Sequence, residues 1–430
     1  MAASQLALST PPRVVERSTF NTEGTGLHKD LELGEVLDSK DNKIVVSGGP
    51  GTGKSYHTRK LIERAKNEGT NVIVVAPTGA AAAEYQNGKT IHSYLGLNGL
   101  NSLLYTLTHY AEGQLYEETL KGPTLMIVDE ASFLDGRVID ELFNLADKLG
   151  FKICLVMDPA QLLGVKVQPF FLSLRLREVK VIRLTKVVRQ KDQDFAEVIS
   201  LLRGKDTAKK ENIILNYLLS RGILLDSPSL DPNEVDICLS RKMLQERNNI
   251  RLLQFVNSGS EGKDLYCYKG LGNSPLYLCK GCPVIIRKND KEKGVVNGDL
   301  GKVVHLSTEN ICIYVNRLDK EVTYEIQIES QGKLKEYKEG YVPQEGEVVL
   351  GLPIQLAFAL TLHLSQGKTF ENVQLFLEQH MTTMHGGAFV GITRHTTSLK
   401  VVCPVDDEGV FNLDFLKASF FFEEKALEFV

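Results

Sequence analysis

Short apolar runs alternate with helix-like segments over the first half of the chain. The segments 55–67 and 137–149 have helical periodicity, and each is followed by a glycine, Gly69 and Gly150. Apolar strands separated by helices predict a parallel sheet that is covered on both faces. The strand-like runs are 43–47, 71–76, 124–128, 152–157 and 179–184.

A second set of strand-like runs follows the turn-rich stretch 227–234. Between 301 and 352 the rhythm changes to short alternating strands, such as GKVVHLS and EVTYEIQI, joined by charged and glycine-rich connections. This pattern predicts a second parallel core that is interrupted by a small antiparallel barrel. The strand-like runs assigned to the second core are 235–240, 283–287, 373–377 and 399–403.

These patterns predict four parts and a lead-in. The expected boundaries are 1–40 for an irregular N-terminal lead-in, 41–190 for the first core with a small insertion at about 85–120, 191–300 and 353–405 for the second core, 301–352 for the inserted β domain, and 406–430 for a C-terminal segment.

Composition places the chain among soluble globular proteins. Its 430 residues are 43% hydrophobic and 24% charged, which is enough for two to four domains. No apolar run approaches the ~18 residues of a membrane span, and the N-terminus lacks a secretory apolar core. We therefore expect a protein of the cytoplasm or nucleus. Seven cysteines fit a reducing compartment, and we interpret the C-x-x-C pair Cys279 and Cys282 as core packing.

The formal net charge of -4 argues against a protein that coats nucleic acid by charge alone. It still allows a narrow basic track across the surface. The basic residues between 287 and 293 are interleaved with Asp290 and Glu292, so we interpret this stretch as a solvated loop.

A phosphate-binding loop stands between the first expected strand and its helix. The sequence GGPGTGKS matches G-x-x-x-x-G-K-S in the required strand-to-helix context. Its backbone N–H groups can surround phosphates, Lys54 can reach the β and γ oxygens, and the Ser55 hydroxyl can bind magnesium. The predicted nucleotide-binding residues are Gly48, Gly49, Pro50, Gly51, Thr52, Gly53, Lys54 and Ser55.

Two further strand ends should meet this loop. Asp129 and Glu130 follow the run 124–128, where Asp129 would share a magnesium ion with Ser55 and Glu130 would polarise the attacking water. The alternative for an isolated Asp-Glu pair is a solvated turn. Gln161 follows the next strand, and the carboxyl ends of parallel strands share one crevice, so we expect it near the γ-phosphate.

Hydrolysis in such a site also needs positive charge at the γ-phosphate in the transition state. The candidates are Arg189, in LTKVVRQ, and Arg394, in VGITRHT. For either residue alone, the alternative is a surface or ion-paired arginine.

The order of these motifs resembles the superfamily 1 helicases, subclass B, of the Pif, RecD and Dda type. The resemblance implies two RecA-like P-loop cores with ATP or another NTP and Mg²⁺ between them, and an SH3-like β-barrel in the second core. The matching segments are 48–55, 76–82, 89–97, 127–132, 157–162, 184–190, 295–304, 358–373 and 389–396.

The resemblance also assigns roles to single residues. It implies that Arg189 and Arg394 are paired arginine fingers, and that Gly367 and Lys368 lie at the nucleotide side of a loop that relays nucleotide state. For His92 and His363 the alternative is a histidine satisfied within the core. The residues implied to touch a nucleic-acid strand are Pro77, Thr78, Gly79, Thr90, His92, His363, Ser365 and Gln366.

Two features depart from the family pattern. The stretch 22–43 before the phosphate loop contains no glutamine of the kind that reads adenine, so the choice among triphosphates stays open. The stretch between His92 and Thr124 is short, so any element that splits a duplex must be small.

We hypothesise a helicase that translocates 5' to 3' on single-stranded nucleic acid, with DNA favoured over RNA, as a monomer or weak oligomer. One alternative is an RNA-virus-like RNA helicase with NTPase and RNA 5'-triphosphatase activity. Another is an NTP-switched binding module whose hydrolysis is vestigial; the intact set from Lys54 to Arg394 argues against it.

Overall fold

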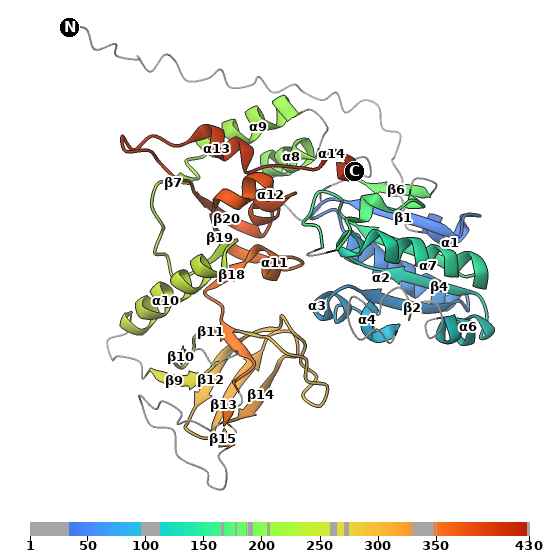
Figure 1. Cartoon of the computed structure of the whole chain (residues 1–430), viewed down its shortest axis with the longest axis horizontal. Helices are drawn as coiled ribbons and strands as arrows, with labels where there is room; N and C mark the ends of the chain where they lie inside the picture. Colours follow the sequence, from blue (N-terminus) through green and yellow to red (C-terminus); the bar gives the residue numbers. More distant parts are fainter. Residues whose placement is uncertain are drawn as a thin grey trace.

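The computed structural model describes two α/β lobes side by side and an antiparallel β unit attached to the second lobe (Figure 1). The described residues are 34–95, 112–164, 167–176, 179–185, 187, 192–203, 207–258, 265–270, 275–326, 328–329, 348–349 and 351–427.

The first lobe is built on a six-stranded parallel sheet of order β3-β2-β4-β5-β1-β6. All five predicted runs are strands of this sheet, and its parallel direction confirms the prediction. Its strands are β1 (Lys43–Gly48), β2 (Asn71–Ala76), β3 (Lys89–Thr90), β4 (Thr124–Val128), β5 (Lys152–Met157) and β6 (Lys180–Leu184).

Helices cover both faces of this sheet. Along β1, Val45 joins one core cluster with helix α7, whereas Ile44 and Val46 join the other with α2. Because neighbouring residues of a strand point to opposite faces, a run that is apolar throughout needs cover on both sides. The helices are α1 (Gly34–Asp38), α2 (Lys54–Asn67), α3 (Gly79–Ala82), α4 (Ile91–Tyr94), α6 (Glu112–Leu120) and α7 (Gly136–Leu149).

The second lobe contains another parallel sheet, of order β18-β8-β19-β20-β7. Its strands are β7 (Leu224–Leu225), β8 (Glu234–Cys238), β18 (Ala359–Thr361), β19 (Phe370–Phe376) and β20 (His395–Val402). Its helices are α8 (Gln193–Leu202), α9 (Thr207–Ser220), α10 (Arg241–Asn257), α11 (Leu362–Ser365), α12 (Gly387–Ile392), α13 (Leu413–Ala418) and α14 (Glu424–Leu427).

The inserted unit is an antiparallel sheet of order β14-β13-β12-β11-β17, with hairpins beside it. Its strands are β9 (Tyr266–Lys269), β10 (Pro275–Leu278), β11 (Pro283–Ile286), β12 (Leu300–Leu306), β13 (Asn310–Val315), β14 (Lys320–Glu325), β15 (Ile328–Glu329), β16 (Val348–Val349) and β17 (Ile354–Leu356).

One assignment from the sequence was wrong. The run 283–287, expected in the second parallel core, is β11 and pairs antiparallel with both β12 and β17. The antiparallel unit therefore begins before 301. A short run that is apolar at every position signals a buried strand, but it carries no information on the direction of its neighbours.

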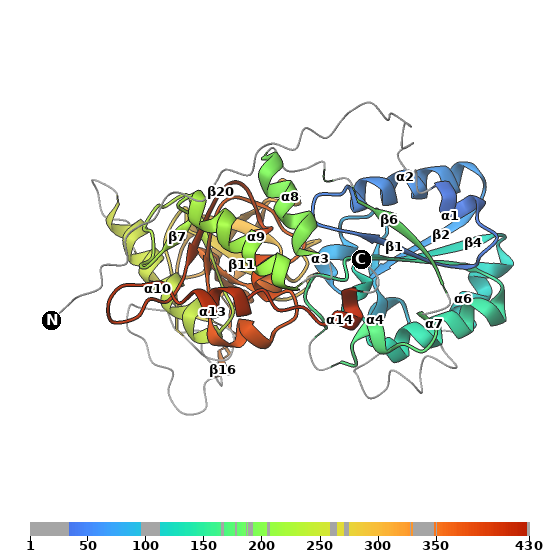
Figure 2. The same ribbon diagram turned by 90° about the horizontal axis from the view of Figure 1, so that it is seen from above.

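The two lobes meet along the side where α3 and α11 face each other (Figure 1) and where α8 and α14 lie at the boundary (Figure 2). Within the described ranges, no helix is both long and apolar enough to cross a lipid bilayer.

Candidate nucleotide and nucleic-acid site

The phosphate loop closes around its own lysine. Gly51 and Gly53 have φ of 72° and 83°, a backbone region that residues with a Cβ avoid. Lys54 Nζ donates to the carbonyls of Gly48 at 2.8 Å and Gly49 at 3.0 Å. Burial lowers the pKa of Lys54, and the nearby Asp158 and Glu130 oppose that shift. The ammonium group therefore occupies the interior of the loop, where phosphate oxygens would replace the carbonyls.

Asp129 and Glu130 stand at the end of β4, beside this loop. Asp129 accepts a hydrogen bond from the Tyr85 hydroxyl at 2.6 Å and one from the Glu130 backbone N–H at 2.8 Å. Glu130 has φ of 51°, which is strained for a residue other than glycine, and such strain clusters at functional sites.

The Glu130 carboxyl is prepared for proton transfer. Its Oε2 is buried and has no hydrogen-bond partner. Burial, and then the charge of Asp129, raise the pKa of Glu130 to about 7. A carboxyl with a pKa near the working pH is suited to act as a general base.

The residues at this end of the sheet fit a magnesium ion that is shared with a nucleotide. Ser55 and Asp129 line one cleft and offer hard oxygen ligands. Among the described residues, no group of three or more His, Cys, Asp and Glu side chains could hold a metal by itself. Mg²⁺ usually binds through one or two carboxylates together with substrate phosphates, so this donor set is sufficient.

A buried polar cluster follows β5. Asp158 is 0% exposed and accepts from Gln161 Nε2 at 3.0 Å. It also accepts from Arg203 Nη2, of the second lobe, at 3.1 Å. Sequence reasoning missed both Tyr85 and Arg203. Neither stands in a recognisable motif, and Arg203 is one of 50 lysines and arginines in the chain.

Arg394 lies at the same boundary, in the turn after α12. It is 4% exposed and donates to the carbonyls of Val390 at 2.9 Å and Lys368 at 3.3 Å. Its charge lowers the pKa of Glu130, so the guanidinium lies within electrostatic reach of that carboxyl. Arg189 lies outside the described residues.

A cleft of about 730 Å³ runs between the lobes and joins the two sets of predicted residues. Ser55, Asp129 and Glu130 line it on the phosphate side. The residues predicted to touch a strand that line it are Pro77, Thr78, Gly79, His363 and Gln366. Gly367 and Lys368, which were predicted on the nucleotide side, line it as well.

Comparison with known proteins finds two matching family models and several similar helicases. A model described as an AAA domain matches residues 32–221, and one described as the viral superfamily 1 RNA helicase core domain matches 303–403. The ATP-dependent DNA helicase PIF1 of Xenopus laevis is 24% identical over 387 residues, covering 85% of this chain and 59% of the relative. Pif1 of Bdellovibrio bacteriovorus is 24% identical over 387 residues, covering 84% and 83%. The chain is similar to the Pif1-like superfamily 1 helicases.

Solved structures of this family share the fold. Bacteroides Pif1 bound to ssDNA has a TM-score of 0.62 at 22% identity, covering 91% of this chain and 96% of that one. Pif1 of Candida albicans has a TM-score of 0.62 at 21% identity, covering 90% and 95%. This Pif1-like chain spans 59% of the length of the Xenopus relative and 50% of RRM3 of Saccharomyces cerevisiae.

Within the Pif1-like fold, some of the residues predicted to contact the strand line the cleft and others do not. Thr78 and Thr90 each cap a short helix, accepting from Ala81 N and Ser93 N at 3.2 Å. Thr90 and His92 are not part of the cleft lining. Burial lowers the pKa values of His92 and His363, so both imidazoles are neutral near pH 7.

Ser365 is buried in the turn of α11. Its side chain is 0% exposed, and its hydroxyl donates to the Leu362 carbonyl at 2.8 Å. The hydroxyl therefore closes this turn, and the strand contact that the family resemblance implies for Ser365 stays a prediction.

Gln366 connects the two halves of the cleft. Its Nε2 donates to Gln161 Oε1 at 2.8 Å, across the lobe boundary. Its own Oε1 is buried and has no hydrogen-bond partner. A predicted strand contact is therefore bonded to the residue that is predicted to sense the γ-phosphate.

Lys368 also lines the cleft, beside the antiparallel unit. A Cβ on Gly298 would stand 3.5 Å from its Nζ. Burial lowers the pKa of Lys368, and Asp299 and Glu84 oppose this shift. Its ammonium group thus faces the antiparallel unit, and its predicted nucleotide role rests on the family resemblance.

The stretch 287–298 is more than a solvated loop. Asn289, Asn297 and Gly298 line the cleft, and Asn289 Oδ1 accepts from Asn297 N at 2.7 Å. A Cβ on Gly79 of the first lobe would stand 3.4 Å from Asn289 Oδ1. The antiparallel unit therefore contributes a wall of the interlobe cleft.

Proposed function

We propose that the chain is an NTP-dependent helicase that moves along single-stranded nucleic acid and separates strands, 5' to 3', with ATP as a substrate. This proposal rests on the cleft between the lobes, because phosphate-side and strand-side residues line it together. The Gln366–Gln161 hydrogen bond joins these sides directly. A motor needs such a link, because hydrolysis of the nucleotide must change the affinity of each lobe for the strand.

The nucleotide would lie at the carboxyl ends of β1, β4 and β5. The loop 48–55 and Lys54 would hold its phosphates, and Ser55 and Asp129 would hold magnesium, which supplies charge neutralisation at the phosphate oxygens. Glu130 would orient and deprotonate the attacking water, and Gln161 would contact the γ-phosphate. Arg394, from the second lobe, and Arg189, as the family resemblance implies, would stabilise the transition state.

The strand would bind across both lobes. The Thr78 and Gly79 segment, Thr90 and His92 would contact it from the first lobe, and His363 and Gln366 from the second. Contacts from small and neutral polar groups to a strand backbone suit stepping that is independent of sequence. We also propose that the two parallel lobes are RecA-like and that the antiparallel sheet is SH3-like.

DNA is favoured over RNA as the strand. The similar proteins are named ATP-dependent DNA helicases, and one similar structure is titled as a complex with ADP-AlF3 and ssDNA. The RNA helicase with RNA 5'-triphosphatase activity and the module with vestigial hydrolysis find no comparable support.

The test is NTPase activity of the full chain with each of the four triphosphates, with and without poly-dT or poly-U. We expect hydrolysis that single-stranded DNA stimulates several-fold. Duplexes with a 5' or a 3' single-stranded tail then test direction, and we expect unwinding from the 5' tail. Hydrolysis that no nucleic acid stimulates would overturn the motor, and exclusive use of the 3' tail would overturn the direction.

A further inference from the structure

Arg203 reaches out of the second lobe to the phosphate loop of the first. It is the residue directly after α8, which lies at the lobe boundary (Figure 2). Its Nη2 donates to Asp158 Oδ1 at 3.1 Å. It belongs to neither segment that was expected to supply an arginine to the pocket.

The guanidinium is buried with an unused donor. Arg203 is 9% exposed, and its Nε is buried with no hydrogen-bond partner. A buried donor without a partner is costly, more so on a charged group, and each such case in a native structure calls for a physical explanation. A ligand that accepts from this face of the guanidinium provides one.

The guanidinium also lies against the phosphate loop. A Cβ on Gly49 would stand 2.8 Å from Arg203 Nη1 and 3.1 Å from its central carbon. Glycine at this position therefore leaves the space in which the guanidinium lies against the loop. Any other side chain there would push it away.

The charges around the loop are arranged for an anion. Arg203 lies close enough to Lys54 that its charge lowers the pKa of that ammonium. Asp158 and Glu130 act on Lys54 in the opposite direction, and Asp158 also pairs directly with Arg203. Two cations, Lys54 and Arg203, are therefore held against one loop, where both could bind the oxygens of a phosphate chain.

We propose that Arg203 is a phosphate-binding residue of the nucleotide pocket, supplied by the second lobe in addition to the two expected arginine fingers. The inference rests on the proposed nucleotide site. The guanidinium has donors on three nitrogens, so Nη2 can keep Asp158 while Nη1, which lies nearest to Gly49, binds a phosphate oxygen and Nε is free to donate to a second partner on another edge. The ammonium of lysine is a point charge and cannot hold these partners in fixed directions. Because the residue belongs to one lobe and the loop to the other, nucleotide binding would strengthen the contact between the lobes.

The experiment compares nucleotide affinity in the full chain carrying Arg203→Gln, Arg203→Lys or the control Arg221→Gln. Arg221 is an exposed arginine of the same lobe, and its ion pairs with Asp192 and Asp194 are remote from the loop. Fluorescent ADP and a fluorescent non-hydrolysable triphosphate would be titrated with Mg²⁺ present.

We expect Arg203→Gln to weaken nucleotide binding by about tenfold to a hundredfold, the usual worth of a charge-assisted hydrogen bond. Arg203→Lys should lose less, and Arg221→Gln nothing. A loss confined to the triphosphate assigns the contact to the terminal phosphate, and an equal loss for ADP assigns it to a phosphate that both nucleotides carry. Wild-type affinity of the Gln variant for both would overturn the proposal.

Removing Arg203 also leaves Asp158 buried without its ion pair, so the variant could lose stability for a purely structural reason. The melting temperature of each variant with nucleotide is therefore compared with its own value without nucleotide, because a ligand that binds more tightly stabilises the folded state more at the same concentration. A structural role alone would lower both temperatures and preserve the difference, which would count against the proposal. Failure of the wild-type chain to bind any nucleotide would instead reject the proposed function.

Discussion

At the scale of single residues, burial sets the protonation of the pocket. Glu130 has a pKa raised to about 7 by burial and by the charge of Asp129. Below that pH the carboxyl is protonated and cannot accept a proton from water. We therefore expect kcat/KM of the NTPase to fall as the pH drops through about 7, measured with saturating single-stranded DNA.

Glu130→Gln is the matched variant for this profile, because it keeps the size of the side chain and removes the titrating group. It should have little hydrolysis at any pH while still binding nucleotide. A wild-type profile that is flat between pH 6 and 8 would contradict the assignment of Glu130 as the base.

Substitutions of Arg394 and of Lys54 should have different effects on NTP turnover. Arg394 comes from the second lobe and lies within electrostatic reach of Glu130, so Arg394→Ala should lower kcat on the order of a thousandfold, with nucleotide affinity nearly unchanged. Lys54→Ala should abolish turnover, because the loop loses its central cation. Steady-state kinetics and nucleotide titration separate the two. Arg221→Ala is the control, and wild-type turnover of the Arg394 variant would refute its role.

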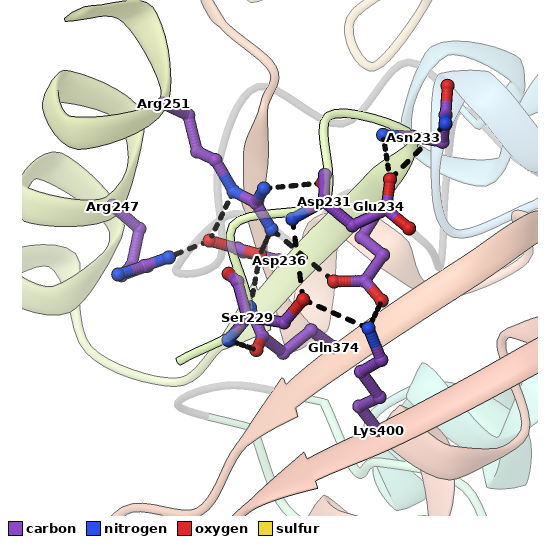
Figure 3. A network of polar contacts seen from close by, with 9 residues as sticks. All are labelled: Ser229, Asp231, Asn233, Glu234, Asp236, Arg247, Arg251, Gln374 and Lys400. Atoms are coloured by element: carbon purple, nitrogen blue, oxygen red, sulfur yellow. Dashed lines mark hydrogen bonds and ion pairs between the residues drawn. The ribbon is translucent and has the colours of Figure 1, made fainter. Parts of the chain in front are cut away.

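At the scale of elements, a buried ion network joins the strands of the second lobe to α10 (Figure 3). Asp236 of β8 is 0% exposed and accepts from Arg247 Nε at 2.8 Å and Arg251 Nη2 at 2.6 Å. Gln374 of β19 donates to the same carboxyl at 2.9 Å, and Lys400 of β20 pairs with Glu234 at 2.5 Å. The Asp236 carboxylate thus fixes the register of β8 and β19 and the position of α10 against them.

Asp236→Asn should destabilise the second lobe by about 3–5 kcal/mol, since it leaves the buried Arg247 without a carboxylate partner and Arg251 with only the more distant Glu234, at 3.8 Å. Equilibrium urea unfolding measures the loss, and hydrogen exchange should show it first in β8 and β19. Asp226→Asn is the matched control, because Asp226 is exposed and bonds only locally to Ser227. A urea midpoint equal to that of the control would reject this account of the network.

At the scale of the whole molecule, the C-terminal segment joins the two lobes. Phe420, Phe422 and Leu427 belong to the core of the second lobe, whereas Ala426 belongs to the core of the first. His385 Nδ1 accepts from Glu423 N at 2.7 Å, so its Nε2 carries the proton and donates to the Pro159 carbonyl at 2.7 Å. The segment therefore restrains the lobes beside the loop that carries Gln161.

Ala426→Arg should release α14 from the first lobe, because a buried methyl is replaced by a long cation. We expect a larger radius of gyration in X-ray scattering and weaker stimulation of the NTPase by single-stranded DNA, while the phosphate loop is untouched. Lys425→Ala, at an exposed neighbouring position, is the control. An unchanged radius and stimulation in the Arg variant would show that α14 does not hold the lobes together.

Local signals explain how much of this molecule is predictable from its residues. The runs 71–76, 124–128 and 152–157 of the first sheet are apolar at nearly every position, which predicts strands covered on both faces. The phosphate loop needs glycines and a lysine at fixed spacing, because backbone conformation and reach are local properties. The parallel lobes and the nucleotide loop could thus be inferred before any coordinates.

Only the tertiary structure decided which distant residues meet. The direction of β11, the burial of Ser365, the bond between Gln366 and Gln161, and the approach of Arg203 to Gly49 all join segments that are far apart in the chain or on different lobes. Sequence patterns report the conformation of neighbouring residues, whereas burial and charge pairing depend on how whole elements pack. The local sequence therefore predicts the nucleotide chemistry, whereas the packing of the lobes determines which distant side chains take part in it.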